Sequence, residues 1–346
     1  MKRVALLQTT GNERIDAILR GLIEVVEAAF PDRVRGYYLK GSYAGGGAVA
    51  TSDIDLTVVF KGGALSDQEE ERIQRVGEAR SQGSSARIDL DAVGERCLRQ
   101  GVASSGDSPR GGYLAYEAIR LKTASLLLYG EDIRDDLSLP MPEAYIHLVT
   151  HAPCDCSGRV LRGATMLVFP LTYPDPTGEF YGYDVFRLGN VYSPTGRGTK
   201  DLVASAGWIA TALIALKAGR YVGSKSDSLR LYRECINDEW MTFLADLYEY
   251  CRSRWAYLVP EDEVERQRLR ALCRRMLAFE NHYLAVYEDY LLAELRSANV
   301  AAQLAAIRRL GQVIYRDGEV AAELRALAGS GDEPLREAAS AVMRQI

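Results

Sequence analysis

The stretch from Gly41 to Leu56, GSYAGGGAVATSDIDL, constrains the fold most, because a glycine-rich segment there runs into two aspartates one residue apart. Side chains alternate across a β-strand, so a strand over 54–60 places Asp53 and Asp55 together on one face. Two carboxylates this close repel each other, and a hard divalent cation bound by oxygen ligands is the usual compensation. The stretch therefore predicts a metal site at the start of an otherwise apolar strand.

The neighbouring residues suit a phosphate group and a third acid. Gly41 lets the backbone approach a ligand closely, and Ser42 supplies a hydroxyl and an amide at the expected start of a helix, where anions are favoured. A strand over 86–93 carries Asp89 and Asp91 on one face, so at least one of them could join the first pair. Three carboxylates around two metals can clamp the attacking and leaving oxygens of a displacement at phosphorus.

The surrounding segments predict a compact domain with α and β elements. Apolar residues recur at helical spacing over 12–30, strand-like runs follow over 35–40, 54–60 and 86–93, and a further helix is expected over 113–128. This order of elements indicates a compact unit that combines helices and strands.

Four segments are expected along the chain. Pro140 and Pro142 mark a linker, and tyrosine, glycine, proline and β-branched residues dominate the segment that follows. Two similar pieces, 304–310 and 335–341, give the end of the chain the pattern of a HEAT-like repeat. One repeat cannot bury its own apolar face, so it must pack on the neighbouring segment. The repeat is also a candidate surface for a protein partner. The predicted segments are an α+β domain over 1–139, an irregular or β-rich insertion over 140–200, an all-helical substrate-binding domain over 201–297 and a HEAT-like helical tail over 298–346.

Charge and composition argue against several classes of function. The formal net charge is −5, so the chain lacks the broad basic surface of a nucleic-acid polymerase, and the acidic balance favours a small or cationic ligand. The start of the chain has no signal-peptide pattern, and the apolar run over 202–216 is too short to span a bilayer. The 6 cysteines are scattered, as is typical of reduced thiols. We expect a cytoplasmic protein with no membrane partner.

The motif residues also carry a resemblance. Gly41-Ser42, then Asp53-Ile54-Asp55 after ten residues, with an acid on a later strand, resembles the DNA polymerase β-like nucleotidyltransferase superfamily. The run from Ser52 to Leu56, SDIDL, in particular is similar to the aminoglycoside adenylyltransferases that modify streptomycin and spectinomycin. The resemblance implies a nucleotidyltransferase fold of the α+β class, with a small mixed sheet and flanking helices, followed by an all-helical C-terminal domain.

In that family two aspartates hold Mg²⁺, the Gly-Ser turn holds the nucleotide phosphates, and a third carboxylate acts as general base. Asp89 matches the base because Ile-Asp-Leu fits the family's apolar-acid-apolar strand, and Asp91 stays open as the alternative. The resemblance implies metal ligation by Asp53, Asp55 and Asp89, and phosphate binding by Gly41 and Ser42.

The helical region carries a fainter likeness to the same family. The turn from Gly219 to Lys225 looks like the family's Gly-Lys-x-x-x-Lys turn, which makes Lys225 a candidate contact to ATP phosphate, with a surface lysine as the alternative. Asp201 falls where the family places an acid that holds a drug amine, although it could equally cap a helix. Arg197 stands where the family has a second acid, which is a departure from the aminoglycoside pattern.

Two other clusters are weaker signals. His147, His151, Cys154 and Cys156 could suggest zinc, but the stretch has the pattern of a strand and Cys-x-Cys is not the usual zinc knuckle. Glu280 lies on an apolar helix, where a buried carboxylate needs a partner, and an arginine is favoured over a cationic ligand.

These observations lead to one expected function and two alternatives. We expect a Mg²⁺-dependent enzyme that passes AMP from ATP to a hydroxyl of a small, cationic acceptor, with an aminoglycoside as the leading candidate and antibiotic resistance as its consequence. The first alternative is a nucleotidyltransferase that acts on a protein or an RNA end, as in the silencing of a toxin. The second is a non-catalytic binding protein on the same fold.

Overall fold

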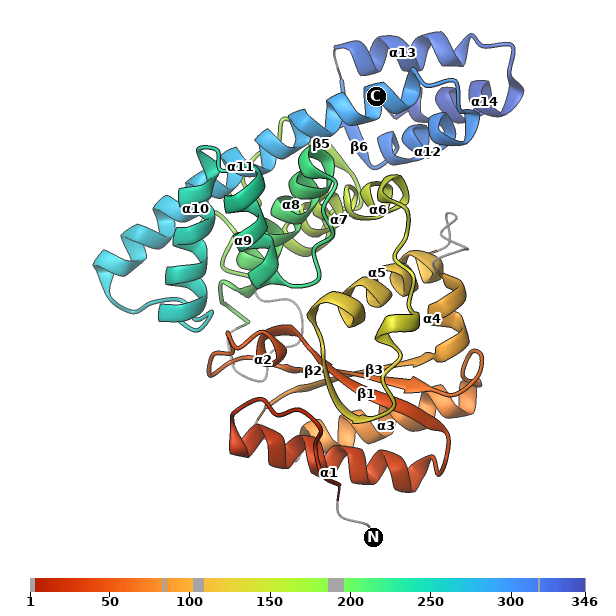
Figure 1. Ribbon diagram of the computed structural model, residues 1–346. Helices are drawn as coiled ribbons and strands as arrows, with labels where there is room; N and C mark the ends of the chain where they lie inside the picture. The colour runs from red at the N-terminus through yellow and green to blue at the C-terminus, as the bar shows by residue number, and fades with distance from the viewer. Residues whose placement is uncertain are drawn as a thin grey trace. The chain divides into compact units, whose positions relative to one another are not determined.

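The computed structural model describes residues 4–82, 84, 86–101, 109–185, 196–316 and 318–345. The chain forms two compact units (Figure 1). The N-terminal unit comprises Met1–Leu148 and Lys217–Ile236, and the C-terminal unit comprises Val149–Leu216 and Asn237–Ile346.

A mixed four-stranded sheet forms the centre of the N-terminal unit, in the order β3-β2-β1-β4. Strand β1 runs antiparallel to both β2 and β4, whereas β2 and β3 are parallel. The strands are β1 (Val34–Lys40), β2 (Ile54–Phe60), β3 (Ile88–Gly94) and β4 (Leu126–Gly130).

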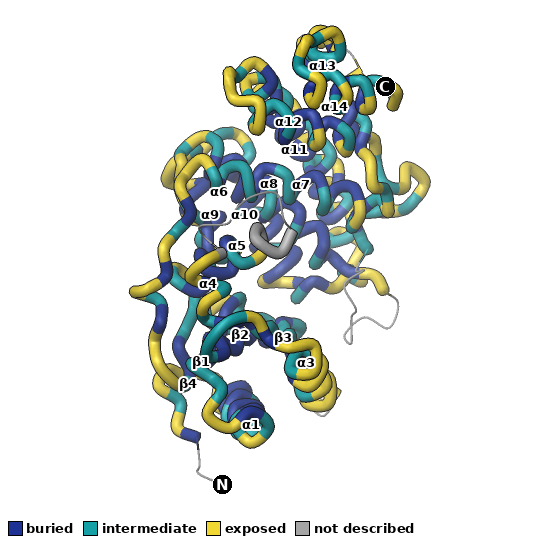
Figure 2. The backbone as a smooth tube through the Cα atoms, turned by 90° about the vertical axis from the view of Figure 1, so that its right-hand side faces the viewer, coloured by how far each residue is buried: buried dark blue, intermediate teal, exposed yellow. Residues whose placement is uncertain are grey.

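Helices cover both faces of this sheet (Figure 1). The helices of the unit are α1 (Glu13–Ala29), α2 (Gly41–Ala44), α3 (Asp67–Gln82), α4 (Glu95–Gly101), α5 (Pro109–Ala124), the 3-10 turn η1 (Arg134–Asp136), α6 (Pro142–Val149) and α9 (Lys225–Cys235). Alternation along β2 sends Ile54, Leu56, Val58 and Phe60 into the core that α1 and α3 share, while Val59 packs into a second core with α4 and α5. The outer side of α3 is largely exposed (Figure 2).

The C-terminal unit is mainly helical. Its elements are α7 (Ala152–Asp155), the π-helices η2 (Cys156–Arg162) and η3 (Leu247–Arg254), α8 (Lys200–Ala218), α10 (Trp240–Asp246), α11 (Glu263–Leu295), α12 (Val300–Leu310), α13 (Glu319–Ala328), α14 (Glu333–Met343) and the parallel strands β5 (Leu167–Phe169) and β6 (Val313–Tyr315). By length and composition α8 could cross a membrane, but 72% of its most apolar window is buried in the structure, as in a core helix.

The predicted α+β class, with a small mixed sheet, flanking helices and a helical C-terminal region, is confirmed. The segment predicted as a helical tail over 298–346 also contains a strand, because β6 lies between α12 and α13. The two pieces that predicted a HEAT-like tail lie on α12 and α14, and their reading as a repeat stays a prediction.

The prediction of irregular or β-rich structure over 140–200 is wrong for residues 142–149 and 152–162, which are helical. Tyr145 and Val149 are both buried, and their spacing of four residues is that of one helix face. Pro142 begins α6, and a proline also stands in the first turn of α7. Proline is favoured at such positions because the first amides of a helix have no partner within it. Of the two prolines that indicated a linker, Pro142 therefore starts a helix.

Candidate active site

Three carboxylates converge at the start of strands β2 and β3. In this parallel pair Asp55 stands opposite Asp89, so their side chains share one face of the sheet. Each of Asp53, Asp55 and Asp89 offers a carboxylate oxygen within 4.8 Å of the others, and all three side chains are partly buried. Oxygen donors in this number and spacing could hold a hard divalent cation. The structure thus brings together the three acids that the sequence predicted as metal ligands, and their binding of a metal stays a prediction.

Gly41 is required next to this group for two reasons. Its φ of +67° lies in the left-handed region, and a Cβ at this position would stand 2.0 Å from Oδ2 of Asp55. Strand β1 places it there, because Lys40 is the register partner of Asp55. The adjacent Ser42 lies in the single turn of α2, partly buried. The glycine therefore allows the backbone of the turn to approach the carboxylates closely.

A second turn holds Asp53 in place. Ser52 is buried, its Oγ accepts a hydrogen bond from the Val49 amide at 2.9 Å, and its own amide donates to the Val49 carbonyl at 2.9 Å. The serine of the SDIDL motif thus closes the loop that leads into β2 and fixes where the first aspartate emerges.

A buried lysine network lies on the same face of the sheet. Lys40 is 1% exposed, and its Nζ donates to Glu117 at 2.6 Å and to Asp91 at 2.9 Å. Glu117, on α5, also accepts from the hydroxyl of Thr57 and lies 3.7 Å from Arg120. Glu117 thus ties α5 to β1 through Lys40 and to β2 through Thr57, and Lys40 in turn pairs with Asp91 on β3.

The two candidate bases on β3 have different partners. Asp91 is bonded to the buried Lys40, whereas Asp89 is bonded to Arg87, whose Nε donates to its Oδ1 at 2.8 Å, and belongs to the carboxylate group. A carboxylate that is already held by a buried cation is a poor candidate for a metal ligand or a base. This arrangement favours Asp89 over Asp91.

The surroundings of Asp55 perturb the pKa of its carboxyl group. Burial raises the pKa of Asp55, and the charge of Asp53 raises it further, while Arg120, Lys40 and Lys225 act in the opposite direction. A carboxylate gathered with others in a partly dry site is the group that a metal cation stabilises most.

Lys225 lies close enough for its charge to act on Asp55. It is the first residue of α9, after the N-cap Ser224, whose Oγ accepts from the Asp227 amide at 3.1 Å. A Cβ at Gly45, just beyond α2, would lie 3.2 Å from Oγ of Ser226. The start of α9 therefore adjoins the loop that follows the Gly-Ser turn.

The loop before Lys225 is fixed against neighbouring helices. A Cβ at Gly223 would stand 2.1 Å from Oγ1 of Thr123, on α5. The Val222 amide donates to the hydroxyl of Tyr145, on α6, at 2.9 Å, and the rings of Tyr145 and Tyr221 lie 4.8 Å apart. The predicted glycine turn is thus held by close packing.

Asp201 belongs to the C-terminal unit. It is buried in the first turn of α8, 1% exposed, and its role in binding a substrate stays a prediction. The expected arginine partner of Glu280 is confirmed, because Arg162 donates to both carboxylate oxygens at 2.9 and 2.8 Å, and the hydroxyl of Tyr183 also donates to Glu280.

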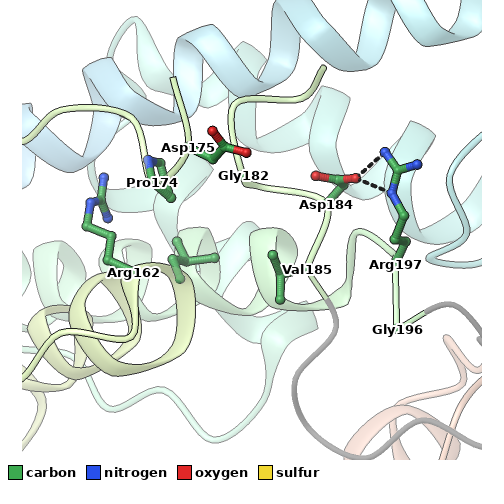
Figure 3. Close-up of a pocket in the computed structure, with 9 residues that line it drawn as sticks. Arg162, Pro174, Asp175, Gly182, Asp184, Val185, Gly196 and Arg197 are labelled. Carbon is green, nitrogen blue, oxygen red and sulfur yellow. Dashed lines mark hydrogen bonds and ion pairs between the residues drawn. The ribbon is translucent and has the colours of Figure 1, made fainter. Parts of the chain in front are cut away.

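A pocket of about 300 Å³, lined in part by Arg162, lies in the C-terminal unit (Figure 3). Its lining includes Arg162, Asp175, Asp184 and Arg197, and Figure 3 shows Arg197 turned toward Asp184, whose Oδ2 accepts from its Nε at 2.6 Å. Acids and arginines therefore line the pocket together, so its charge favours neither an anion nor a cation.

The histidines and cysteines considered for zinc have other contacts. His151 Nδ1 lies 3.0 Å from the hydroxyl of Tyr287, and Nε2 contacts Gln312. Burial lowers the pKa of His151 and raises the pKa of Cys154 well above its usual value. Within the stretch 147–156, which was expected as a strand, residues 147–149 end α6 and residues 152–155 form α7.

Sequence reasoning missed Lys40, Glu117 and Arg87. Lysine at the end of an apolar strand and glutamate on the apolar face of a helix were visible signals, because such charges are seldom buried without a partner. Their pairing depends on contacts between distant segments.

Comparison with known proteins agrees with this geometry. Residues 19–91 match the family model of the nucleotidyltransferase domain, a segment that contains the Gly-Ser turn and all three carboxylates. No curated protein matches the chain. Among solved structures, the chain is similar to spectinomycin adenyltransferase AAD(9) from Enterococcus faecialis, determined with ATP and spectinomycin, at 14% identity and a TM-score of 0.42 over 78% of this chain and 97% of that chain. The chain therefore contains a nucleotidyltransferase domain, and the predicted enzyme class is confirmed.

Proposed function

We propose that the protein transfers AMP from ATP to a hydroxyl of a small acceptor and releases pyrophosphate. The observation that carries this proposal is the group of Asp53, Asp55 and Asp89, whose oxygens lie within 4.8 Å of one another inside the matched domain. Mg²⁺ suits such a site because it takes carboxylate oxygens together with substrate phosphates. When bound, Mg²⁺ would supply a Lewis acid that offsets the charge developing on the phosphates.

Each residue then has a defined task. Gly41 and Ser42 bind the triphosphate at a turn where the backbone can approach it, and the ammonium of Lys225 attracts the same phosphates. Asp89 accepts the proton of the attacking hydroxyl, and the oxygen of that hydroxyl bonds to the α-phosphorus. The bond between the α-phosphorus and the bridging oxygen breaks, and pyrophosphate leaves with that electron pair.

An aminoglycoside is the proposed acceptor, with Asp201 as the acid that holds one of its ammonium groups. The similarity of the SDIDL run to the streptomycin and spectinomycin enzymes supports this choice, as does the net charge of −5. We place the protein in the cytoplasm, where ATP and Mg²⁺ are available.

The test is pyrophosphate release from Mg-ATP with a panel of aminoglycosides, with Asp89→Asn as the control. Release that depends on an aminoglycoside and that only the wild type gives would support the proposal. Binding of Mg-ATP without release would keep the nucleotide site and reject these acceptors, and proteins and RNA ends would then be tested as acceptors. Failure to bind Mg-ATP would refute nucleotidyl transfer.

A further inference from the structure

Arg87 occupies an unexplained position at the edge of the carboxylate group. It immediately precedes β3, and its backbone carbonyl accepts a hydrogen bond from the Ile54 amide at 2.8 Å, so it lies beside the peptide that joins Asp53 to Ile54. Its side chain shares a face with Asp89, two residues later, and its Nε donates to Asp89 Oδ1 at 2.8 Å.

A stabilising role does not account for this pair. The side chain of Arg87 is 33% exposed and that of Asp89 is 36% exposed. Ion pairs at this exposure contribute little to stability, because water screens them and ordering two side chains costs entropy. The pair differs in this respect from the buried contact of Lys40 with Glu117.

We propose that Arg87 is the counter-cation of Asp89 while the metal site is empty, and that it binds a phosphate group of the nucleotide once a divalent cation takes Asp89. The inference rests on the proposed function and adds a phosphate-binding residue to it. A divalent cation held by Asp89 would compete with the guanidinium of Arg87 for the carboxylate and would repel it. The anionic oxygens of the triphosphate then become the favourable acceptors, and the planar guanidinium fork matches phosphate geometry.

Two opposite effects follow when Arg87 is replaced by a neutral side chain. A divalent cation should bind the protein more tightly in the absence of nucleotide, because its competitor is gone. The nucleotide should bind more weakly, because a charge-assisted hydrogen bond to phosphate is lost. If Arg87 had a purely structural role, its replacement would not tighten cation binding and weaken nucleotide binding together.

The experiment compares wild type with Arg87→Gln, in the full-length protein, by titration with Mn²⁺ alone and then with Mg-ATP. We expect Mn²⁺ to bind Arg87→Gln about three- to tenfold more tightly than wild type. The affinity for Mg-ATP should fall by about tenfold or more. Thermal unfolding should be unchanged. The matched control is Arg33→Gln, which removes another exposed arginine–carboxylate pair, with Glu69, at the opposite end of β1 and should leave both affinities unchanged.

Unchanged or weaker Mn²⁺ binding in Arg87→Gln would overturn the counter-cation role, and unchanged Mg-ATP affinity would overturn the phosphate contact. Neither titration needs turnover. A wild-type protein that binds Mn²⁺ and Mg-ATP but releases no pyrophosphate with any acceptor would therefore contradict the proposed function, while the two titrations would still decide the role of Arg87.

Discussion

Removal of the charge at Lys40 should destabilise the N-terminal unit strongly. Lys40 and Glu117 are each 1% exposed, and their charged atoms lie 2.6 Å apart, so Lys40→Met leaves a buried carboxylate without its closest cation. Loss of one partner of a buried ion pair costs about 3–5 kcal/mol of the free energy of unfolding. At about 2–4 °C per kcal/mol for a unit of this size, the melting temperature should fall by about 6–20 °C.

The double variant Lys40→Met/Glu117→Gln tests whether the loss of stability comes from the unpaired carboxylate of Glu117. Because no unpaired carboxylate remains at Glu117, we expect it to recover most of the lost stability, to within about 1–2 kcal/mol of wild type. The assay is thermal and urea unfolding followed by circular dichroism, with Arg33→Gln as the exposed control. A loss below about 1 kcal/mol in Lys40→Met, the magnitude of a surface pair, would refute the reasoning.

Three further predictions concern the carboxylates. Gly41→Ala should cost about 1–2 kcal/mol through its positive φ and should abolish Mn²⁺ binding, because the new Cβ displaces Asp55; normal Mn²⁺ affinity would contradict this. Asp89→Asn should lower turnover by about 10²–10⁴-fold and leave nucleotide binding intact, whereas Asp91→Asn should keep most of the activity. If rate assays show the greater loss for Asp91→Asn, Asp91 is the base. Because the pKa of Asp55 is raised in the folded protein, its ionisation opposes folding, so Asp55→Asn should raise the melting temperature of the metal-free protein near pH 7. That gain should disappear as the pH falls below the ordinary aspartate pKa, and a gain independent of pH would exclude this cause.

The carboxylate site was predictable because its signals are local. The two-residue period of a strand puts Asp53 and Asp55 on one face, and Gly41-Ser42 precedes them at short range. The expected convergence of Asp89 required only that its strand lie next to β2, as it does. The turn before Lys225 was also marked by its glycines.

Helical segments with ambiguous patterns were predicted less well. The helix expected over 113–128 ends at Ala124, and Leu126–Gly130 forms strand β4 instead. A short leucine run suits a buried helix and a buried strand equally, and pairing with β1 decides between them. The prolines near residue 142 had the same ambiguity between linker and helix start.

The sequence by itself determined the fold class, the face that carries the carboxylates and the identity of the three acids, because each follows from the strand period and from residue chemistry. Only the tertiary structure decided which cation lies next to each of the two acids on β3, Asp89 and Asp91. Lys40 reaches Glu117 across 77 positions of sequence and Asp91 across 51, and this pairing sets Asp91 apart from Asp89. Electrostatic energy depends on distance and burial in three dimensions, which residue order does not specify.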